Sequence, residues 1–279
     1  MKNDLHQKVI EDFGNEWQSF DQSSLSRSEL AGQFKRYFNT EHFAQLKREQ
    51  VLKIIDFGAG SGRWTSLILE EFPESLITAV EPSEAVNVLH KRFSKMENVT
   101  IEKISFEELE ESNIELESFD VVYCFGVLHH TSDIKENFRK LVGLAKKNGV
   151  IFCYIYYDLE FRPFWYRTIW KLSNYPRSVI SRLPFFAKNI ICELIALTVY
   201  FPIVKIGKLF PKNIQHNLPL FGYFDRSFYS MRTDARDRFG TRVEKRMSKK
   251  DITNMCAQNQ LSEVQFSDIH PFWVFSCRK

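Results

Sequence analysis

The chain has 279 residues, of which 44% are hydrophobic and 26% are charged. This balance is typical of a globular protein and excludes an intrinsically disordered one, and the length suits one large domain or two small ones. The net charge of +3 is unevenly spread, because residues 158–250 hold 18 Lys and Arg against 7 Asp and Glu. That segment therefore carries +11 and the remainder −8, which suits either a solvated surface or an anionic partner.

The five cysteines form no C-x-x-C pair, and their number is odd. This favours reduced thiols over a disulfide framework or a zinc site, and it fits a cytoplasmic protein. Residues 1–14 contain no apolar run of the kind that a signal peptide needs, so we expect no signal peptide. The cysteines are Cys124, Cys153, Cys192, Cys256 and Cys277.

Residues 51–157 alternate between short apolar segments typical of strands and segments with apolar residues at helical spacing. The expected strands are 51–58, 75–83, 99–105, 119–128 and 150–157. The expected helices are 62–72, 83–95, beginning at a cap on Ser83, and 132–149, ended by Gly149. Such alternation predicts a parallel sheet with helices on both faces.

The alternation stops after Tyr157. Residues 158–247 are rich in proline, aromatic and basic residues and are expected to form short helices. A helix capped by Ser248 follows over 248–260, and then come two strands, 261–269 and 272–279, around a turn at His270–Pro271. The predicted organisation is given by four ranges: an N-terminal helical arm at 1–50, an α/β core at 51–157, a helical insertion or acceptor lid at 158–247, and a return to the core at 248–279. We expect the arm, including residues 13–22, to pack over the open edge of the site.

The most apolar segment is residues 189–210. Glu193, Pro202 and Lys205 interrupt it, so it falls short of the roughly 18 apolar residues expected of a membrane span. A buried or lid helix is one interpretation, and an interfacial helix resting on a membrane is the other.

The sharpest motif is the stretch "IIDFGAGSG", in which a strand leads into Gly58, Gly60 and Gly62. Glycine permits positive φ angles and a close approach of the backbone to a ligand, and the next helix points its N-terminal N–H groups at that ligand. Arg63 occupies the third glycine position of a dinucleotide fingerprint, and a phosphate-binding P-loop is absent. The alternative is a tight strand–helix turn without a ligand.

Glu81 stands at the end of the second expected strand, 21 residues after Gly60, and is followed by Pro82. A carboxylate there can accept hydrogen bonds from both hydroxyls of a ribose. The alternative is a carboxylate that only stabilises the start of a helix through its dipole.

Four stretches together resemble a known family: "IIDFGAGSGRW", "AVEPSE", "FDVVYCFGVLHHTSD" and "KKNGVIF". In order and spacing they are similar to class I S-adenosylmethionine-dependent methyltransferases. The resemblance implies a Rossmann-like α/β fold with a seven-stranded, mostly parallel sheet whose last strand is antiparallel, and a large helical insertion after strand five. It also implies S-adenosylmethionine as the cofactor. More narrowly, the chain is similar to bacterial methyltransferases found with polysaccharide and small-molecule biosynthesis.

The resemblance assigns the cofactor contacts by position. Asp56 and the loop Gly58–Ala59–Gly60 would hold the methionine part, Glu81 would bind the ribose, and Pro82 would flank the adenine.

The remaining cofactor contacts follow the third and fourth strands. The adenine-contact position, usually Asp in the family, is Ser105 here and precedes Phe106, so backbone N–H groups and stacking would replace the carboxylate. Phe125 and Gly126 would lie near the sulfonium.

The stretch "FGVLHHTSD" places His129 and His130 after the fourth strand. We expect no metal, because adjacent residues do not converge on one ion and no further ligands accompany them. His130 is the first candidate for a general base that deprotonates an acceptor hydroxyl, and His129 is the second. Asp133 is expected to cap the following helix. The alternative is that the histidines only shape the loop and contact the cofactor.

The insertion is expected to form the acceptor pocket. Its first candidates are Tyr156, Tyr157, Arg162, Trp165 and Tyr166. A second polar cluster consists of Tyr229, Arg232, Asp234, Arg236 and Arg238. Arginines there could grip a carboxylate or phosphate of an anionic acceptor, or they could simply be solvated on a lid.

The predicted function is methyl transfer to a hydroxyl of a small molecule or glycan precursor. The alternatives are N- or C-methylation, a lipid-linked acceptor at a membrane surface, and a non-catalytic protein that binds S-adenosylmethionine as a scaffold. A nucleic-acid partner is not expected, because no RNA-binding module is recognised and the basic residues alternate with apolar helices. Peripheral membrane contact through the insertion stays open, as does the oligomeric state.

Overall fold

The computed structural model describes residues 2–20, 25–46, 51–267 and 273–279. The chain divides into two compact units. The first comprises residues 1–22, 30–158 and 245–279, and the second comprises 23–29 and 159–244. The core and the return to it thus belong to one unit, and the insertion makes up most of the other.

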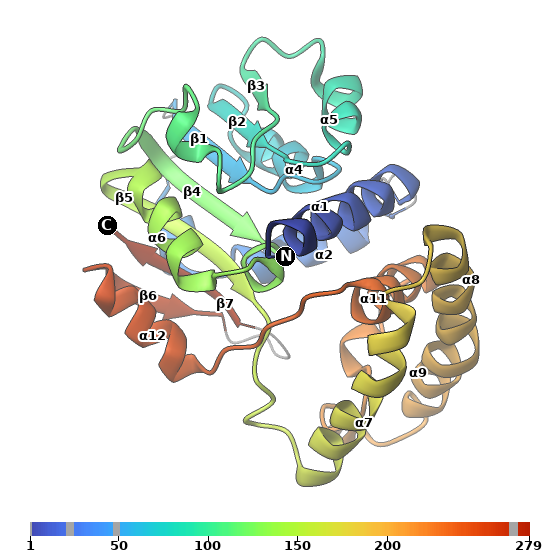
Figure 1. Cartoon of the computed structure of the whole chain (residues 1–279). Coiled ribbons are helices and arrows are strands. Elements are labelled where there is room, and N and C mark those ends of the chain that lie inside the picture. The colour runs from blue at the N-terminus through green and yellow to red at the C-terminus, as the bar shows by residue number, and fades with distance from the viewer. Residues whose placement is uncertain (1, 21–24, 47–50, 268–272) are drawn as a thin grey trace. The chain divides into compact units, whose positions relative to one another are not determined.

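The first unit is built on a seven-stranded sheet in the order β3-β2-β1-β4-β5-β7-β6 (Figure 1). Strands β1 to β5 run parallel, and β7 is antiparallel to both of its neighbours. The order reverses between β1 and β4, which is where ligands bind in open α/β sheets. The predicted fold class is therefore confirmed. The strands are β1 Lys53–Phe57, β2 Leu76–Val80, β3 Val99–Glu102, β4 Phe119–Phe125, β5 Ala145–Ile155, β6 Ser262–Phe266 and β7 Trp273–Arg278.

Helices flank this sheet, and two of the predicted caps are confirmed. The Asp133 carboxylate accepts hydrogen bonds from the Lys135 and Glu136 N–H groups. Ser248 forms a reciprocal capping box with Asp251. The helices are α1 Lys2–Ser19, α2 Arg27–Tyr37, α3 Glu41–Ala44, α4 Arg63–Glu71, α5 Val86–Phe93, α6 Ile134–Leu144 and α12 Lys249–Gln258, with the short 3-10 turns η1 Leu109–Glu111 and η2 Leu128–His130.

Two predicted helix boundaries are wrong. Helix α6 ends at Leu144 rather than at Gly149, because Ala145 pairs with Phe119 of β4 and the chain joins the sheet there. Helix α5 begins at Val86 rather than at Ser83, whose hydroxyl instead accepts a hydrogen bond from the Ala85 N–H. The predicted turn at His270–Pro271 lies outside the described residues.

One face of the sheet is covered by an aromatic core that explains the high phenylalanine content. Phe38, which follows α2, lies 5.2 Å from Phe125 and 5.5 Å from Phe152, measured between ring centroids. Trp64 of α4 joins them at 5.6 Å from Phe125. Each such ring buries a large apolar area, so this cluster anchors the carboxyl end of β4, where the site is formed.

The second unit is helical and has its own small core. Residues 185–207 form one uninterrupted helical segment, α8 Phe185–Ile195, the π-helical turn η3 Ala196–Tyr200 and α9 Phe201–Gly207. Pro202 is the second residue of α9, just after η3, and the wider π-helical turn accommodates the proline without breaking the segment. The other elements are α7 Phe164–Ile180, α10 Lys212–Gln215, η4 Phe221–Tyr223 and α11 Phe228–Gly240.

This segment corrects a prediction about membrane spans. By length and composition, the 23 residues Phe185–Gly207, with a mean hydropathy of 1.9, are long and apolar enough to cross a membrane. Glu193, Pro202 and Lys205 do not shorten the helix, because the proline is accommodated and the 23 residues hold only three charged side chains, Lys188, Glu193 and Lys205.

Candidate functional site

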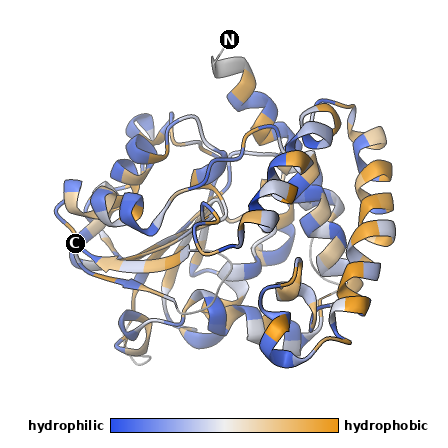
Figure 2. Cartoon of the chain, turned by 90° about the horizontal axis from the view of Figure 1, so that it is seen from below, coloured by the Kyte–Doolittle hydropathy of each residue, from blue (hydrophilic) through white to orange (hydrophobic). Residues whose placement is uncertain are grey.

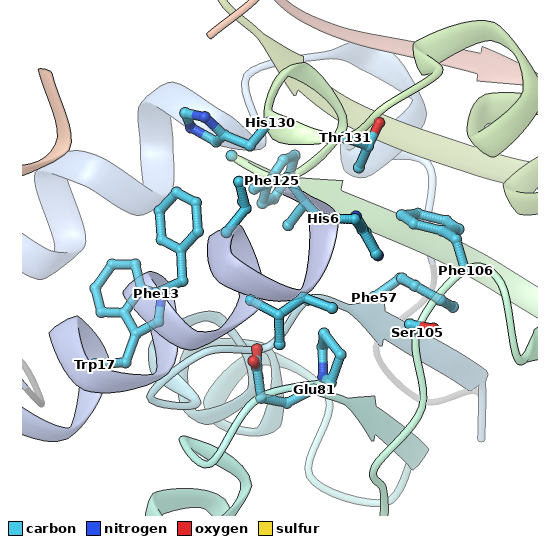
Figure 3. Close-up of a pocket in the computed structure, with 16 residues that line it drawn as sticks. His6, Phe13, Trp17, Phe57, Glu81, Ser105, Phe106, Phe125, His130 and Thr131 are labelled. Atoms are coloured by element: carbon cyan, nitrogen blue, oxygen red, sulfur yellow. The ribbon is translucent and has the colours of Figure 1, made fainter. Parts of the chain in front are cut away.

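A pocket lies in the first unit at the carboxyl ends of β1, β2 and β4 (Figure 3). Most of the predicted cofactor residues come together in its wall, although they are spread over 69 positions of sequence. Those that line it are Gly58, Glu81, Pro82, Ser105, Phe106, Phe125 and Gly126. Parallel strands end at the same edge of the sheet, and this geometry brings their loops together.

The glycine loop is shaped as the motif predicts. Gly58, Gly60 and Gly62 all have positive φ angles, of 85°, 55° and 76°. A Cβ on Gly58 would come within 2.3 Å of the Val127 side chain, so this position also requires glycine for space. The Gly58 N–H donates to the Val80 carbonyl at 2.8 Å, which ties the loop to the end of β2.

Glu81 is 5% exposed and links the glycine loop to the next turn. Its carboxylate accepts hydrogen bonds from the Gly60 N–H at 2.8 Å and from the Ser83 N–H at 3.0 Å. Burial raises the pKa of Glu81 above its ordinary value. The Ser83 hydroxyl also donates to this carboxylate, at 2.5 Å. A carboxylate offers about four acceptor positions, so about one is left for a ribose hydroxyl, and a second becomes available if the Ser83 hydroxyl turns away.

Asp56 lies beneath the glycine loop, is 1% exposed, and does not line the pocket. The Thr65 hydroxyl donates to it at 2.6 Å, which joins β1 to α4. Burial raises the pKa of Asp56 to about 7. Ala59 and Gly60 are likewise outside the pocket wall, so the methionine contacts assigned to these three residues stay predictions.

The raised pKa of Asp56 makes stability depend on pH. Between pH ~4 and ~7 the unfolded chain loses this proton while the folded chain keeps it, so the free energy of unfolding falls as pH rises through that range. Asp56→Asn cannot lose a proton, and we expect the difference in stability between variant and wild type to change by up to about 4 kcal/mol over this window. Urea unfolding at several pH values measures this difference in stability between Asp56→Asn and the wild type. A difference that stays constant with pH would contradict the raised pKa of Asp56.

The two histidines occupy different environments. His130 is 5% exposed, lines the pocket and lies 4.8 Å from the Phe13 ring. His129 is fully buried and stacks on Tyr156 at 3.9 Å. Burial, and then the charges of His130 and Arg246, hold the pKa of His129 well below its ordinary range. His130 is therefore the histidine that can reach a ligand, and its role as a base stays a prediction.

Helix α1 supplies one wall of the pocket, as expected for the N-terminal arm, but the sequence did not indicate which of its residues would do so. Phe13 and Trp17 lie on the side of the pocket shown at the left of Figure 3. Val9, Phe13 and Trp17 recur every four residues, and this helical stripe is the signal that could have identified them. The cavity that they leave has a volume of about 100 Å³, against the ~300–1,000 Å³ typical of ligand sites, so binding of a nucleoside requires these side chains to shift.

The predicted acceptor residues are divided between the units. Tyr156 and Tyr157 lie in the first unit, where Arg246 stacks over the Tyr156 ring at 5.0 Å. The others lie in the second unit: Arg162, Trp165, Tyr166, Tyr229 and Arg232. Their assignment to an acceptor stays a prediction.

Several arginines of the insertion already have partners within the second unit. Arg232 pairs with Glu193 at 2.7 Å, and Arg238 pairs with Glu244 at 2.9 Å. Arg162 donates to the His216 carbonyl at 2.9 Å. These partners would compete with an anionic acceptor for the guanidinium groups.

Comparison with known proteins indicates which protein family the residues around this pocket resemble. Residues 55–151 match a family model described as a methyltransferase domain. This stretch of the chain is similar to a methyltransferase domain. The matched domain contains Asp56, the glycine loop, Glu81 and both histidines, and its cofactor is S-adenosylmethionine. The predicted enzyme class and cofactor are thus confirmed for the domain, whereas the association with polysaccharide biosynthesis is not shown.

Solved structures show the same fold around the methyltransferase domain. The chain resembles 1,6-didemethyltoxoflavin-N1-methyltransferase of Burkholderia thailandensis, with a TM-score of 0.53 and 12% identity over 100% of this chain and 90% of that one. It also resembles magnesium protoporphyrin IX methyltransferase of Synechocystis PCC 6803, with a TM-score of 0.52 and 13% identity over 100% of both chains. Both of those structures contain S-adenosylhomocysteine.

A sequence comparison corrects the prediction about nucleic acid. Over 138 residues the chain is 31% identical to the tRNA U34 carboxymethyltransferase of Campylobacter jejuni strain 81-176, covering 47% of this chain and 42% of that protein. The same enzyme from strain NCTC 11168 matches equally. The chain thus spans less than half the length of these relatives. Because they act on tRNA by name, the exclusion of a nucleic-acid partner is wrong.

Proposed function

We propose that the protein transfers a methyl group from S-adenosylmethionine to an acceptor that meets the pocket beside His130. The observation that carries this proposal is the convergence of the glycine loop, Glu81 and His130 on one pocket of a methyltransferase domain. Figure 3 shows Glu81 and His130 on opposite sides of that pocket. One side can therefore hold a nucleoside while the other faces the reacting atoms.

The residues fit the cofactor. Gly58 and Gly60 form a cradle that a Cβ would fill, and the Glu81 carboxylate has about one acceptor position left for a hydroxyl. S-adenosylmethionine supplies a methyl group on a positively charged sulfonium. Phe125 and Phe13 provide apolar walls that exclude water, and His130 can accept the proton that the acceptor atom loses as it forms its new bond to the methyl carbon.

A tRNA acceptor is the first candidate, and the similarity to the tRNA-modifying relatives supports it. The charge of the second unit supports it as well, because residues 159–244 hold 14 Lys and Arg against 6 Asp and Glu. A net charge of +8 attracts a polyanion through release of counterions.

A hydroxyl of a small molecule or glycan precursor is the second candidate. It is favoured by His130 in the pocket wall, since transfer to a hydroxyl is helped by a general base and an imidazole can act as one. We propose the cytoplasm as the compartment, because all five cysteines are free and buried.

Binding of S-adenosylhomocysteine tests the cofactor site. At 100 times the dissociation constant, we expect ~2.7 kcal/mol of added stability, seen as a rise of several degrees in the melting temperature. Scanning fluorimetry measures it, with adenosine diphosphate as the control ligand. An unchanged melting temperature at millimolar ligand would overturn the assignment.

Transfer of a labelled methyl group separates the two acceptors. The protein is incubated with methyl-labelled S-adenosylmethionine and either total bacterial tRNA or a pool of hydroxylated metabolites and sugar nucleotides. Label in tRNA that is lost after ribonuclease treatment supports the first candidate. Label in the small-molecule pool alone supports the second, and label in neither refutes both.

A further inference from the structure

We propose that the helical segment Phe185–Gly207 docks the protein on the surface of an anionic lipid bilayer, lying in the interface rather than crossing it. The proposal goes beyond methyl transfer and holds for either acceptor. It starts from exposure: among the described residues, 18 of the 23 exposed large hydrophobic side chains belong to the second unit. Exposed apolar surface on this scale marks a site of interaction.

Five of the seven exposed large hydrophobic side chains of this segment form one stripe, and the other two are Val199 and Ile206. The five are spaced four, four, three and four residues apart, which places them on a single face of the helix. They are Phe186, Ile190, Leu194, Leu197 and Phe201, which are 76%, 46%, 53%, 53% and 37% exposed. Figure 2 shows hydrophobic residues repeating along this helix at the right of the view.

The opposite face of the same segment packs within the second unit. Ala196, Tyr200 and Val204 are buried in a cluster with Met231 and Ala235 of α11. The segment is thus two-sided, with one apolar face used for folding and another apolar face left exposed.

Polar groups on the inward side argue against a spanning helix. Lys188 is fully buried on α8, and Glu193 pairs with Arg232 of α11 at 2.7 Å. Although the segment is about 35 Å long and could cross a bilayer of ~30 Å, crossing would take these charges into hydrocarbon. A position in the membrane interface buries the exposed stripe and keeps the charges of Lys188 and Glu193 in water or protein.

Charge identifies the partner as an anionic bilayer. Residues 164–215 hold eight Lys and Arg and a single acidic residue, Glu193. Lys205, Lys208 and Lys212 are exposed at the C-terminal end of the segment. Long basic side chains beside an apolar stripe can reach lipid phosphates while the stripe enters the acyl region.

Helix α7 carries a second stripe of the same kind. Trp165, Ile169, Leu172, Tyr175 and Val179 are all exposed, at spacings of four, three, three and four residues. Arg167 and Lys171 are exposed on the adjoining face of the helix. Six of the ten side chains in the two stripes are aliphatic. This suits a membrane better than RNA, whose protein interfaces are more polar and stack bases mainly on aromatic rings.

Flotation with lipid vesicles tests the proposal on the whole protein. Vesicles of phosphatidylcholine alone are compared with vesicles containing about one third phosphatidylglycerol. The double variant Leu194→Glu/Leu197→Glu is expected to weaken binding to anionic vesicles by about 100-fold, roughly tenfold per substitution. The double variant Lys205→Gln/Lys208→Gln should weaken it by about 25-fold on anionic vesicles and little on neutral ones.

Leu116→Glu is the matched control, because Leu116 is 60% exposed in the first unit and undergoes the same chemical change. It should bind as the wild type does, and every variant should keep the melting temperature and the affinity for S-adenosylhomocysteine. If the wild-type protein does not bind S-adenosylhomocysteine, the cofactor assignment fails, but vesicle flotation still tests the membrane proposal.

Three results would overturn the proposal. The first is a wild-type protein that stays unbound with both kinds of vesicle. The second is a dimer, measured by light scattering, that Leu194→Glu/Leu197→Glu turns into a monomer without changing vesicle binding, which would place a second copy on the stripe. The third is loss of tRNA binding in that variant while vesicle binding is unchanged.

Discussion

Replacing Glu81 by alanine is expected to weaken binding of S-adenosylhomocysteine by about 100-fold. A hydrogen bond to a charged group contributes ~1.5–3 kcal/mol, and the ribose offers two hydroxyls to this carboxylate. The substitution also removes the acceptor of the Gly60 and Ser83 N–H groups, which loosens the glycine loop. Isothermal titration calorimetry measures the loss of affinity.

Two further variants separate ribose binding from damage to the loop. Glu81→Gln keeps one oxygen acceptor and should fall between the wild type and Glu81→Ala in affinity. Glu84→Ala removes a nearby carboxylate that is 64% exposed and pairs with Lys103, and it should bind the ligand normally. Equal affinity in Glu81→Ala and the wild type would remove Glu81 from the cofactor site.

Replacing His130 by alanine is expected to lower the rate of methyl transfer to a hydroxyl by about 10²–10⁴-fold, the usual contribution of a general base. The affinity for S-adenosylhomocysteine should change little, because the carboxylate and glycine loop that hold the nucleoside remain. The rate is measured as transfer of the methyl label to whichever acceptor takes it up in the labelling experiment.

His90→Ala provides the control for His130, since His90 is an exposed histidine on α5. It should leave the rate unchanged. His129→Ala should mainly lower the melting temperature, because it removes a buried ring stacked on Tyr156. Normal turnover in His130→Ala would refute the base and leave His130 as part of the pocket wall.

Much of the cofactor side of the site could be predicted from the sequence because its signals are local. The glycine loop needs positive φ angles at three positions, and only a few residues separate it from the strand that delivers it. Glu81 ends the neighbouring parallel strand, so the topology alone brings it beside Gly60. Asp133 and Ser248 cap their helices through backbone groups two or three residues away.

Other features could not be predicted because they depend on burial by distant segments. Neighbouring histidines look alike in the sequence, yet His129 packs under Tyr156 while His130 faces the pocket. Helix α6 stops at Leu144 because pairing of Ala145 with β4 outweighs the local helical pattern. The arginines of the insertion looked available, but Arg232 and Arg238 found acidic partners 39 and 6 residues away.

The sequence by itself determined the class of fold, because strand period and glycine geometry are properties of short stretches of chain, and its resemblance to methyltransferases indicated the cofactor. The ribose contact of Glu81 stays a prediction. Only the tertiary structure decided that α1 narrows the pocket with Phe13 and Trp17, which of the histidines can reach a ligand, and which face of Phe185–Gly207 stays exposed. The physical reason is that exposure depends on which surfaces meet in the fold, and those surfaces come from segments far apart in the chain.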